Sequence, residues 1–334
     1  MTRIDPARTH ETASLEAPAP LLCSAFDPSG RFVFAGAQDR TVLRWELETK
    51  TRVALAGHKS WVRSLAFVDE GRVLVTAGYD GRLGWWQVDE KTPKPIRMVD
   101  AHQGWIRSVA VSPDGTLLAT AGNDRRVRLW TADDGKLVRE LAGHDDHVYN
   151  VAFHPDGKQV VSADLKLIAK DWRVSDGKQL RSLDTAKILH QYDKSMQCNL
   201  GGARSMSFSP DGESLLVGGI IVVATNIFDG GAGSKPTAVV IDWKTGSRRL
   251  LHRPTAPLPA VLWGLCWHKD GFWIGASGGA IGGHLLFWRK DEPDDFFRLK
   301  LPSPGRGLSL HPDGIRLAIP HFDSRLRVFA MKEA

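Results

Sequence analysis

Pairs of large apolar residues recur along the chain at a fixed separation and define its repeat. In five copies the second member follows the first by 19 residues: Phe26 and Trp45, Phe67 and Trp86, Val111 and Trp130, Phe153 and Trp172, and Leu310 and Phe329. Two further copies are longer, with 35 residues from Phe208 to Trp243 and 21 from Trp267 to Trp288. Seven copies of one unit indicate a protein in which each unit buries its apolar face against its neighbours.

A tight turn and short alternating strands follow the first member of each pair. In the third unit the turn is Pro113-Asp114-Gly115, where proline presets φ and glycine accepts a positive φ. The runs 117–121 and 127–130 alternate with a period of two, and no stretch has sustained helical spacing. The pattern predicts an all-β chain that forms a seven-bladed β-propeller with four-stranded antiparallel blades.

Length and composition fit one such ring. The 334 residues divide into units of about 48, so we expect a single propeller domain over 1–334. The three cysteines, Cys23, Cys198 and Cys266, form no cluster, which favours a reducing compartment over a disulfide framework or a zinc site. Residues 1–24 contain no long apolar run. We therefore expect a cytoplasmic protein without a signal peptide or a membrane span.

The net charge of +6 and the isoelectric point of about 9.3 raise the question of nucleic-acid binding. The basic residues are scattered through turns and alternate strand positions of many units, as Arg72, Arg125 and Lys170 illustrate. This distribution favours a solvated surface over nucleic acid as the main partner.

Polar residues recur in register with the tryptophans. The second unit has His58, Thr76, Asp80 and Trp86, and the third has His102, Thr120, Asp124 and Trp130. The fourth has His144, Ser162 and Trp172, with Lys166 where an aspartate is expected. In these motifs nearly the whole chain resembles the WD-repeat (WD40) family, although the Trp-Asp dipeptide that names the family is missing. The resemblance implies that an N-terminal strand, here Glu11–Glu16, completes the last blade and closes the ring.

The resemblance also implies a partner-binding top face, formed by the loops that precede the innermost strands and by the loops between the second and third strands. In the family, exposed top-face side chains stand beside the first apolar residue of the innermost strand and just before the turn aspartate. Here these positions are Trp61, Arg63, Tyr79, Trp105, Arg107, Asn123, His147, Tyr149, Arg204, Trp263 and Arg306. Aromatic residues and arginine are enriched at binding anchors. An alternative is that these side chains only cover the rim of the channel.

Several residue groups that resemble catalytic, phosphate-binding or metal sites are better explained as structural features. The repeated His, Thr and Asp sets lack an oxyanion stabiliser and a pocket, so they predict a buried hydrogen-bond network rather than hydrolytic triads. The glycine clusters 230–233 and 278–283 precede no helix, which favours turns over a phosphate loop. A metal at His190, Asp193 and Cys198 is the weaker alternative to a loop. We expect no cofactor, no metal and no catalytic activity.

Two insertions fall at adjacent places in the fourth and fifth units, near 185–201 and 220–234. Both open onto the top face, and the second is expected to form a projecting hairpin that turns at Asp229-Gly230-Gly231. Long loops in compact domains are functional or disordered.

These features predict a non-enzymatic scaffold that binds partner proteins or peptides, acidic ones included, on the top face. The alternatives are nucleic-acid or phosphate-ligand binding through the top-face arginines and, last, a propeller enzyme. Much of this functional inference rests on analogy at the level of the fold.

Overall fold

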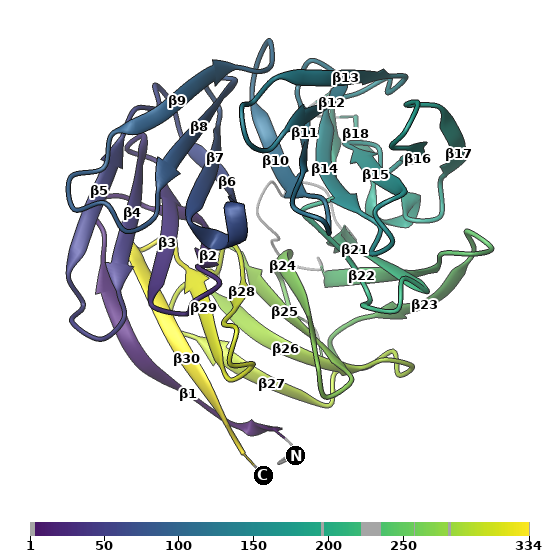
Figure 1. The fold of residues 1–334 in the computed structure, drawn as a ribbon. Coiled ribbons are helices and arrows are strands. Elements are labelled where there is room, and N and C mark those ends of the chain that lie inside the picture. Colours follow the sequence, from purple (N-terminus) through teal and green to yellow (C-terminus); the bar gives the residue numbers. More distant parts are fainter. Residues whose placement is uncertain (1–3, 195–196, 222–234, 257, 280–281, 334) are drawn as a thin grey trace.

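The protein forms a ring of seven four-stranded antiparallel sheets (Figure 1) in a computed structural model, which describes all residues except 1–3, 195–196, 222–234, 257, 280–281 and 334. Blade one comprises β2 (Leu21–Phe26), β3 (Phe32–Ala37), β4 (Thr41–Glu46) and β5 (Arg52–Ala56). Blade two comprises β6 (Val62–Val68), β7 (Val73–Gly78), β8 (Arg82–Gln87) and β9 (Pro95–Asp100). Blade three comprises β10 (Ile106–Val111), β11 (Leu117–Gly122), β12 (Arg126–Thr131) and β13 (Leu137–Ala142).

The other four blades follow the same order. Blade four comprises β14 (Val148–Phe153), β15 (Gln159–Asp164), β16 (Ala169–Arg173) and β17 (Gln179–Leu183), and blade five comprises β20 (Ser205–Phe208), β21 (Ser214–Ile221), β22 (Lys235–Asp242) and β23 (Arg248–His252). Blade six comprises β24 (Val261–His268), β25 (Phe272–Gly278), β26 (Gly283–Arg289) and β27 (Phe297–Leu301). Blade seven comprises β28 (Ser309–Leu310), β29 (Arg316–Pro320), β30 (Arg325–Glu333) and β1 (Ile4–Glu16). The predicted seven-bladed propeller is confirmed.

The N-terminal strand closes the ring, as expected. β1 is antiparallel to β30, with Glu11 opposite Phe329 and Glu16 opposite Arg325. The strand is longer than predicted, because it begins at Ile4 rather than at Glu11. Ile4 at the start of β1 therefore pairs with Glu333 at the end of β30, along the outside of blade seven (Figure 1). Without β1, β30 would be an open edge.

The core lies between neighbouring blades. Between blades two and three, for example, Trp85 and Leu83 pack with Ile106, Leu118 and Trp130 in one buried cluster. The innermost strands β2, β6, β10, β14, β20, β24 and β28 contact one another around a central channel. Because each sheet buries both faces against neighbours, the residues nearest the channel are held by a rigid frame.

The repeated polar network forms as predicted in blades two and three. In blade three, the Trp130 indole N–H donates to Thr120 Oγ1 at 2.9 Å, and the two nitrogens of His102 lie 2.7 Å from that hydroxyl and 2.8 Å from Asp124. Although burial opposes ionisation, the hydrogen bond from His102 and the charge of Arg128 hold the pKa of Asp124 well below its usual range. The pKa of His102 is lowered by burial, which favours the neutral imidazole.

Blade four corrects one prediction. Lys166 was expected to leave His144 without a carboxylate, but Asp164 lies 3.0 Å from His144 Nδ1, while Ser162 takes the position of Thr120. Asp164 stands where blades two and three have Gly78 and Gly122, at which an added Cβ would point directly at the histidine ring. An aspartate at that position reaches the imidazole from two residues earlier in the chain. Lys166 instead points outward toward Asp146.

The first insertion is structured in its described part. It contains the 3₁₀ turn η2 (Lys187–Leu189) and a hairpin of β18 (Gln191–Asp193) with β19 (Cys198–Leu200). Leu189 is buried with Ala186 and Ala203 in the core cluster between blades four and five. In the second insertion, β21 and β22 remain paired as far as Ile221 and Lys235. The expected turn at 229–231 lies outside the described residues.

Helices are almost absent from this fold. Besides η2, there is one further 3₁₀ turn, η1 (Asp69–Gly71), within the ranges given above. No helix in the described part of the chain is long and apolar enough to cross a membrane.

Candidate functional site

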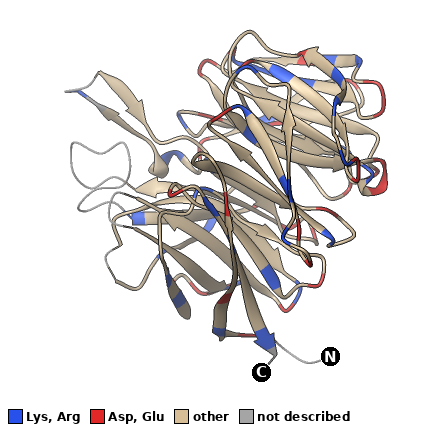
Figure 2. Cartoon of the chain, turned by 90° about the vertical axis from the view of Figure 1, so that its left-hand side faces the viewer, with Lys and Arg blue, Asp and Glu red and all other residues tan. Residues whose placement is uncertain are grey.

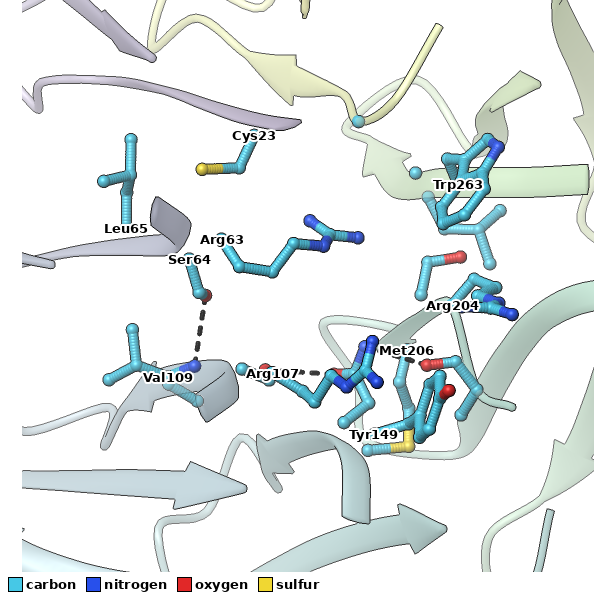
Figure 3. A pocket seen from close by; sticks show the side chains of 18 of the residues that line it. Cys23, Arg63, Ser64, Leu65, Arg107, Val109, Tyr149, Arg204, Met206 and Trp263 are labelled. Atoms are coloured by element: carbon cyan, nitrogen blue, oxygen red, sulfur yellow. Dashed lines mark hydrogen bonds between the residues drawn. The ribbon is translucent and has the colours of Figure 1, made fainter. Parts of the chain in front are cut away.

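A cavity of about 870 Å³ occupies the central channel and opens on the top face. Its wall comes from the innermost strands, with small side chains such as Ser24, Ser64, Ser108 and Ser205. Larger side chains at or next to the first residues of these strands point into the same space, among them Arg63, Arg107, Tyr149, Arg204 and Trp263 (Figure 3). This volume is within the range of sites that bind small molecules or single side chains.

Eight of the eleven predicted top-face residues line this cavity: Trp61, Arg63, Tyr79, Arg107, Tyr149, Arg204, Trp263 and Arg306. The other three stand apart from it. Trp105 stacks on the outer side of Tyr79, Asn123 accepts a hydrogen bond from Arg107, and His147 is exposed.

Backbone hydrogen bonds bring the two kinds of top-face position together. The Tyr79 N–H donates to the Trp61 carbonyl at 2.8 Å, and the Asn123 N–H donates to the Trp105 carbonyl at 2.9 Å. In blades two and three, therefore, the residue before the turn aspartate is tied to the loop that precedes the innermost strand. In these blades the repeat thus places both residues, the one before the turn aspartate and the one before the innermost strand, at the mouth of the channel.

Aromatic rings and guanidinium groups alternate around this mouth. Tyr79 and Trp105 stack in parallel, with ring centroids 4.4 Å apart and an angle of 2° between the planes. The Arg107 guanidinium lies 4.9 Å from the Trp105 ring and 4.4 Å from the Tyr149 ring. Such contacts combine dispersion with the attraction between a cation and the face of a ring.

The alternation continues into blades five, six and seven. Arg204 lies 5.0 Å from both the Tyr149 and the Trp263 rings. Arg306 lies 4.8 Å from Trp263 and 5.0 Å from Phe322. The indole N–H of Trp263 donates to the Gly278 carbonyl at 3.1 Å, so this ring is fixed between the two arginines.

Gly202 determines how closely the chain approaches Tyr149. Its φ is +88°, and an added Cβ would lie 2.6 Å from the phenol ring. A residue with a side chain would be strained in the backbone and would displace the ring. Gly202, which directly follows the first insertion, thereby holds Tyr149 against Arg204.

Phe322 belongs to this array, but it was not among the predicted residues. It lines the cavity, and it stands just before the turn aspartate Asp323, as Tyr79 stands before Asp80. Applying that positional rule to blade seven would have identified it. Trp61, Trp105 and Phe322 expose 42%, 44% and 46% of their surface, which leaves large apolar faces free on the top face.

The cavity contains little that resembles acid–base machinery. Its lining, among the residues that the structure describes, includes no Asp, Glu, His or Lys side chain. Burial raises the pKa of the Cys23 thiol to about 11, so this group is protonated at neutral pH and is a poor nucleophile. In the same described part of the chain, no group of three His, Cys, Asp or Glu side chains could hold a metal ion.

Comparison with known proteins matches the first part of the chain. The family described as WD40 (WD domain, G-beta repeat) matches residues 10–46, 49–87, 93–131 and 135–172. The chain is 31% identical over 72 residues to nuclear distribution protein nudF 2 of Talaromyces marneffei, covering 22% of this chain and 16% of that protein. It is 32% identical over 71 residues to mouse WD repeat and FYVE domain-containing protein 1, covering 21% and 17%.

The chain therefore spans less than a fifth of the length of these relatives. The family matches cover blades one to four, and the same four-stranded unit, with the same order of strands, continues through blades five, six and seven. Blades one to four therefore belong to the WD-repeat (WD40) family, and the chain as a whole forms a seven-bladed β-propeller.

Proposed function

We propose that this protein is a non-enzymatic interaction platform that binds a partner protein, or an extended peptide segment of one, across the top face. The observation that carries this proposal is the array of aromatic and arginine side chains around the mouth of the channel. Such side chains provide large contact areas at a low cost in conformational entropy, and they are typical of binding hot spots.

The exposed rings are the predicted anchors. Trp61 and Trp105 lie on either side of Tyr79, and the stacking holds all three side chains in place before a partner arrives. Preorganised side chains lose little freedom on binding, so more of the contact energy contributes to affinity. The arginines favour segments that carry carboxylate or phosphate groups.

The proposal also covers the cellular location of the protein and the absence of a catalytic step. We place the protein in the cytoplasm, because all three cysteines are free thiols. We assign no catalytic step, because the histidines of the repeated network are buried and hydrogen-bonded within their blades. In this proposal residues 1–334 act as one rigid domain.

The test compares partner capture by matched variants. Trp61→Ala and Trp105→Ala should each reduce, by roughly tenfold, the proteins captured from an extract and quantified by mass spectrometry. Leu137→Ala is the control, because Leu137 is 52% exposed but lies on an outermost strand, away from the channel. Unchanged capture by both tryptophan variants, with a loss in Leu137→Ala, would move the site to the outer rim.

A second candidate function is binding of nucleic acid or of a small phosphate ligand. The four arginines at the cavity favour it, because each guanidinium can bind a phosphate through two N–H groups. Aromatic side chains that alternate with arginines would also suit stacked bases.

A further inference from the structure

The cavity has a charge imbalance that the fold alone does not require. Four arginines line it, and the described lining residues include no carboxylate. Like charges that share a confined cavity repel one another, and partly buried charges are screened less than exposed ones. A bound anion would relieve this repulsion.

Arg204 is the arginine most prepared for such an anion. Its two faces are covered by Tyr149 and Trp263, so only the edge of the guanidinium, with its N–H groups, remains for a ligand. Its Nε is shielded from solvent and has no hydrogen-bond partner among the residues that the structure describes. A buried donor without an acceptor is costly. Burial, together with the charges of Arg107 and Arg63, lowers the pKa of Arg204.

The neighbouring arginines are oriented by neutral groups. Arg63 Nη1 donates to the Leu22 carbonyl at 3.0 Å. Arg107 donates from Nε to Asn123 Oδ1 and from Nη1 to the Tyr79 hydroxyl, both at 3.0 Å. These hydrogen bonds fix the side chains, but among the described residues no carboxylate forms an ion pair with Arg63 or Arg107. Figure 3 shows Arg63, Arg107 and Arg204 directed into one space.

We propose that this space is a binding site for a single oxyanion, a carboxylate or a phosphate, carried on a side chain of the bound partner segment and contacted by Arg63, Arg107 and Arg204. The inference rests on the proposed function and names the group that the platform recognises. The aromatic rings that flank Arg204 exclude water from the contact, which strengthens a charged hydrogen bond.

The arrangement favours a peptide over a nucleic acid. A strand of nucleic acid presents phosphates at regular intervals and needs a track of basic residues. Here the arginines line one cavity, and elsewhere basic and acidic residues are interspersed over the ribbon (Figure 2). One recessed anion site therefore fits one charged side chain better than a polyanion.

The experiment measures thermal stabilisation of the full chain at constant ionic strength. The probes are inorganic phosphate, a set of otherwise identical peptides with Ser, Glu or phosphoserine at one position, and oligothymidylates of increasing length. A ligand that binds only the native state raises Tm as its concentration passes Kd. We expect phosphate to raise Tm, and the Glu or phosphoserine peptide to do so at lower concentration than the Ser peptide. The order of Glu and phosphoserine identifies which oxyanion the site prefers.

Variants locate the effect. Arg204→Gln should weaken phosphate binding by about tenfold or more, since a hydrogen bond to a charged group is lost. Arg63→Gln is the second variant, in case Arg204→Gln does not fold. Arg31→Gln is the control, because Arg31 is exposed, pairs with Glu46 and lies outside the cavity lining. Its phosphate binding should equal that of the unmodified protein.

Three results would overturn the proposal. They are no shift of Tm with any probe, equal binding by Arg204→Gln and Arg31→Gln, or binding of oligothymidylate with an affinity that increases with its length. The proposed function fails separately. If phosphate binds through Arg204 while Trp61→Ala and Trp105→Ala capture partners normally, the oxyanion site stands and the top-face platform does not.

Discussion

Blade four offers a direct test of how the repeated network stabilises the propeller. Asp164 has only 3% of its side chain exposed, and it lies within hydrogen-bond distance of His144 Nδ1 and of the Ile168 N–H, each at 3.0 Å. Lys166, at the usual aspartate position, has 44% of its side chain exposed and lies 3.5 Å from Asp146. We predict that Asp164→Ala destabilises the protein and that Lys166→Ala does not.

The expected magnitude follows from these contacts. Without Asp164, the Nδ1–H of His144 remains buried without an acceptor, which costs about 1–3 kcal/mol. The Ile168 N–H is only partly buried and recovers some hydration, so it adds roughly 1 kcal/mol. Asp164→Ala should therefore cost about 2–4 kcal/mol. The exposed Lys166–Asp146 pair contributes about 0–1 kcal/mol, so Lys166→Ala should change little.

The assay is equilibrium unfolding in urea, followed by tryptophan fluorescence and by circular dichroism. Coincident transitions are needed, because propellers are repeat proteins whose cooperativity can break down. Asp124→Ala in blade three is the reference, because Asp124 lies 2.8 Å from His102 Nδ1. If Lys166→Ala costs as much as Asp164→Ala, or if Asp164→Ala is neutral while Asp124→Ala is not, the substitution of one aspartate for the other is refuted.

Three further predictions concern closure, pH and packing. Deleting residues 1–16 removes the partner of β30 and should lower Tm and promote aggregation, and an unchanged Tm would contradict this. Burial lowers the pKa of His252 and of His321 to about 4 in the folded protein. Because these histidines bind protons in the unfolded chain at a higher pH than in the folded protein, the free energy of unfolding should fall as the pH is lowered from 6.5 to 4, by at most roughly 3 kcal/mol for each histidine. Urea melts at several pH values, with His321→Gln for comparison, check this. Trp130→Ala should cost about 3–5 kcal/mol in the same melts.

The architecture was predictable because the strands, turns and buried positions of each blade require the same residue types at the same spacing. The spacing from Phe67 to Trp86 reflects two strands and the two turns that precede them, and the register pairs Trp86 with Leu74 on the neighbouring strand. Even blade five, with its longer span, keeps this pattern, since β21 and β22 remain in register from Ser214 opposite Asp242 to Ile221 opposite Lys235. A pattern that depends on pairing and burial tolerates insertions at its ends.

Reasoning from spacing failed in blade four, where the role of an aspartate depends on the direction in which its side chain points and not on its position in the repeat. Asp164 and Asp124 make the same contact with a histidine from different positions, because the strand end at Gly78 and Gly122 faces the imidazole as closely as the following turn does. The spacing of the motif shows only that the usual aspartate is absent at position 166 of blade four. The structure of the first insertion was not predictable either, since Leu189 is buried in the core between blades four and five, and the spacing of the repeat does not specify that packing.

The site itself lies between these two cases. The repeat determines that residues at the start of each innermost strand reach the channel mouth, but not which way their side chains turn or what they stack on. Arg204 stands between Tyr149 and Trp263 because three different blades contribute one member each and because Gly202 permits the approach of Tyr149. The positions are thus equivalent by repeat, while their side chains are complementary across blades. That complementarity explains why guanidinium groups that repel one another can share one cavity: the rings between them separate the charges while their edges remain directed toward a common ligand.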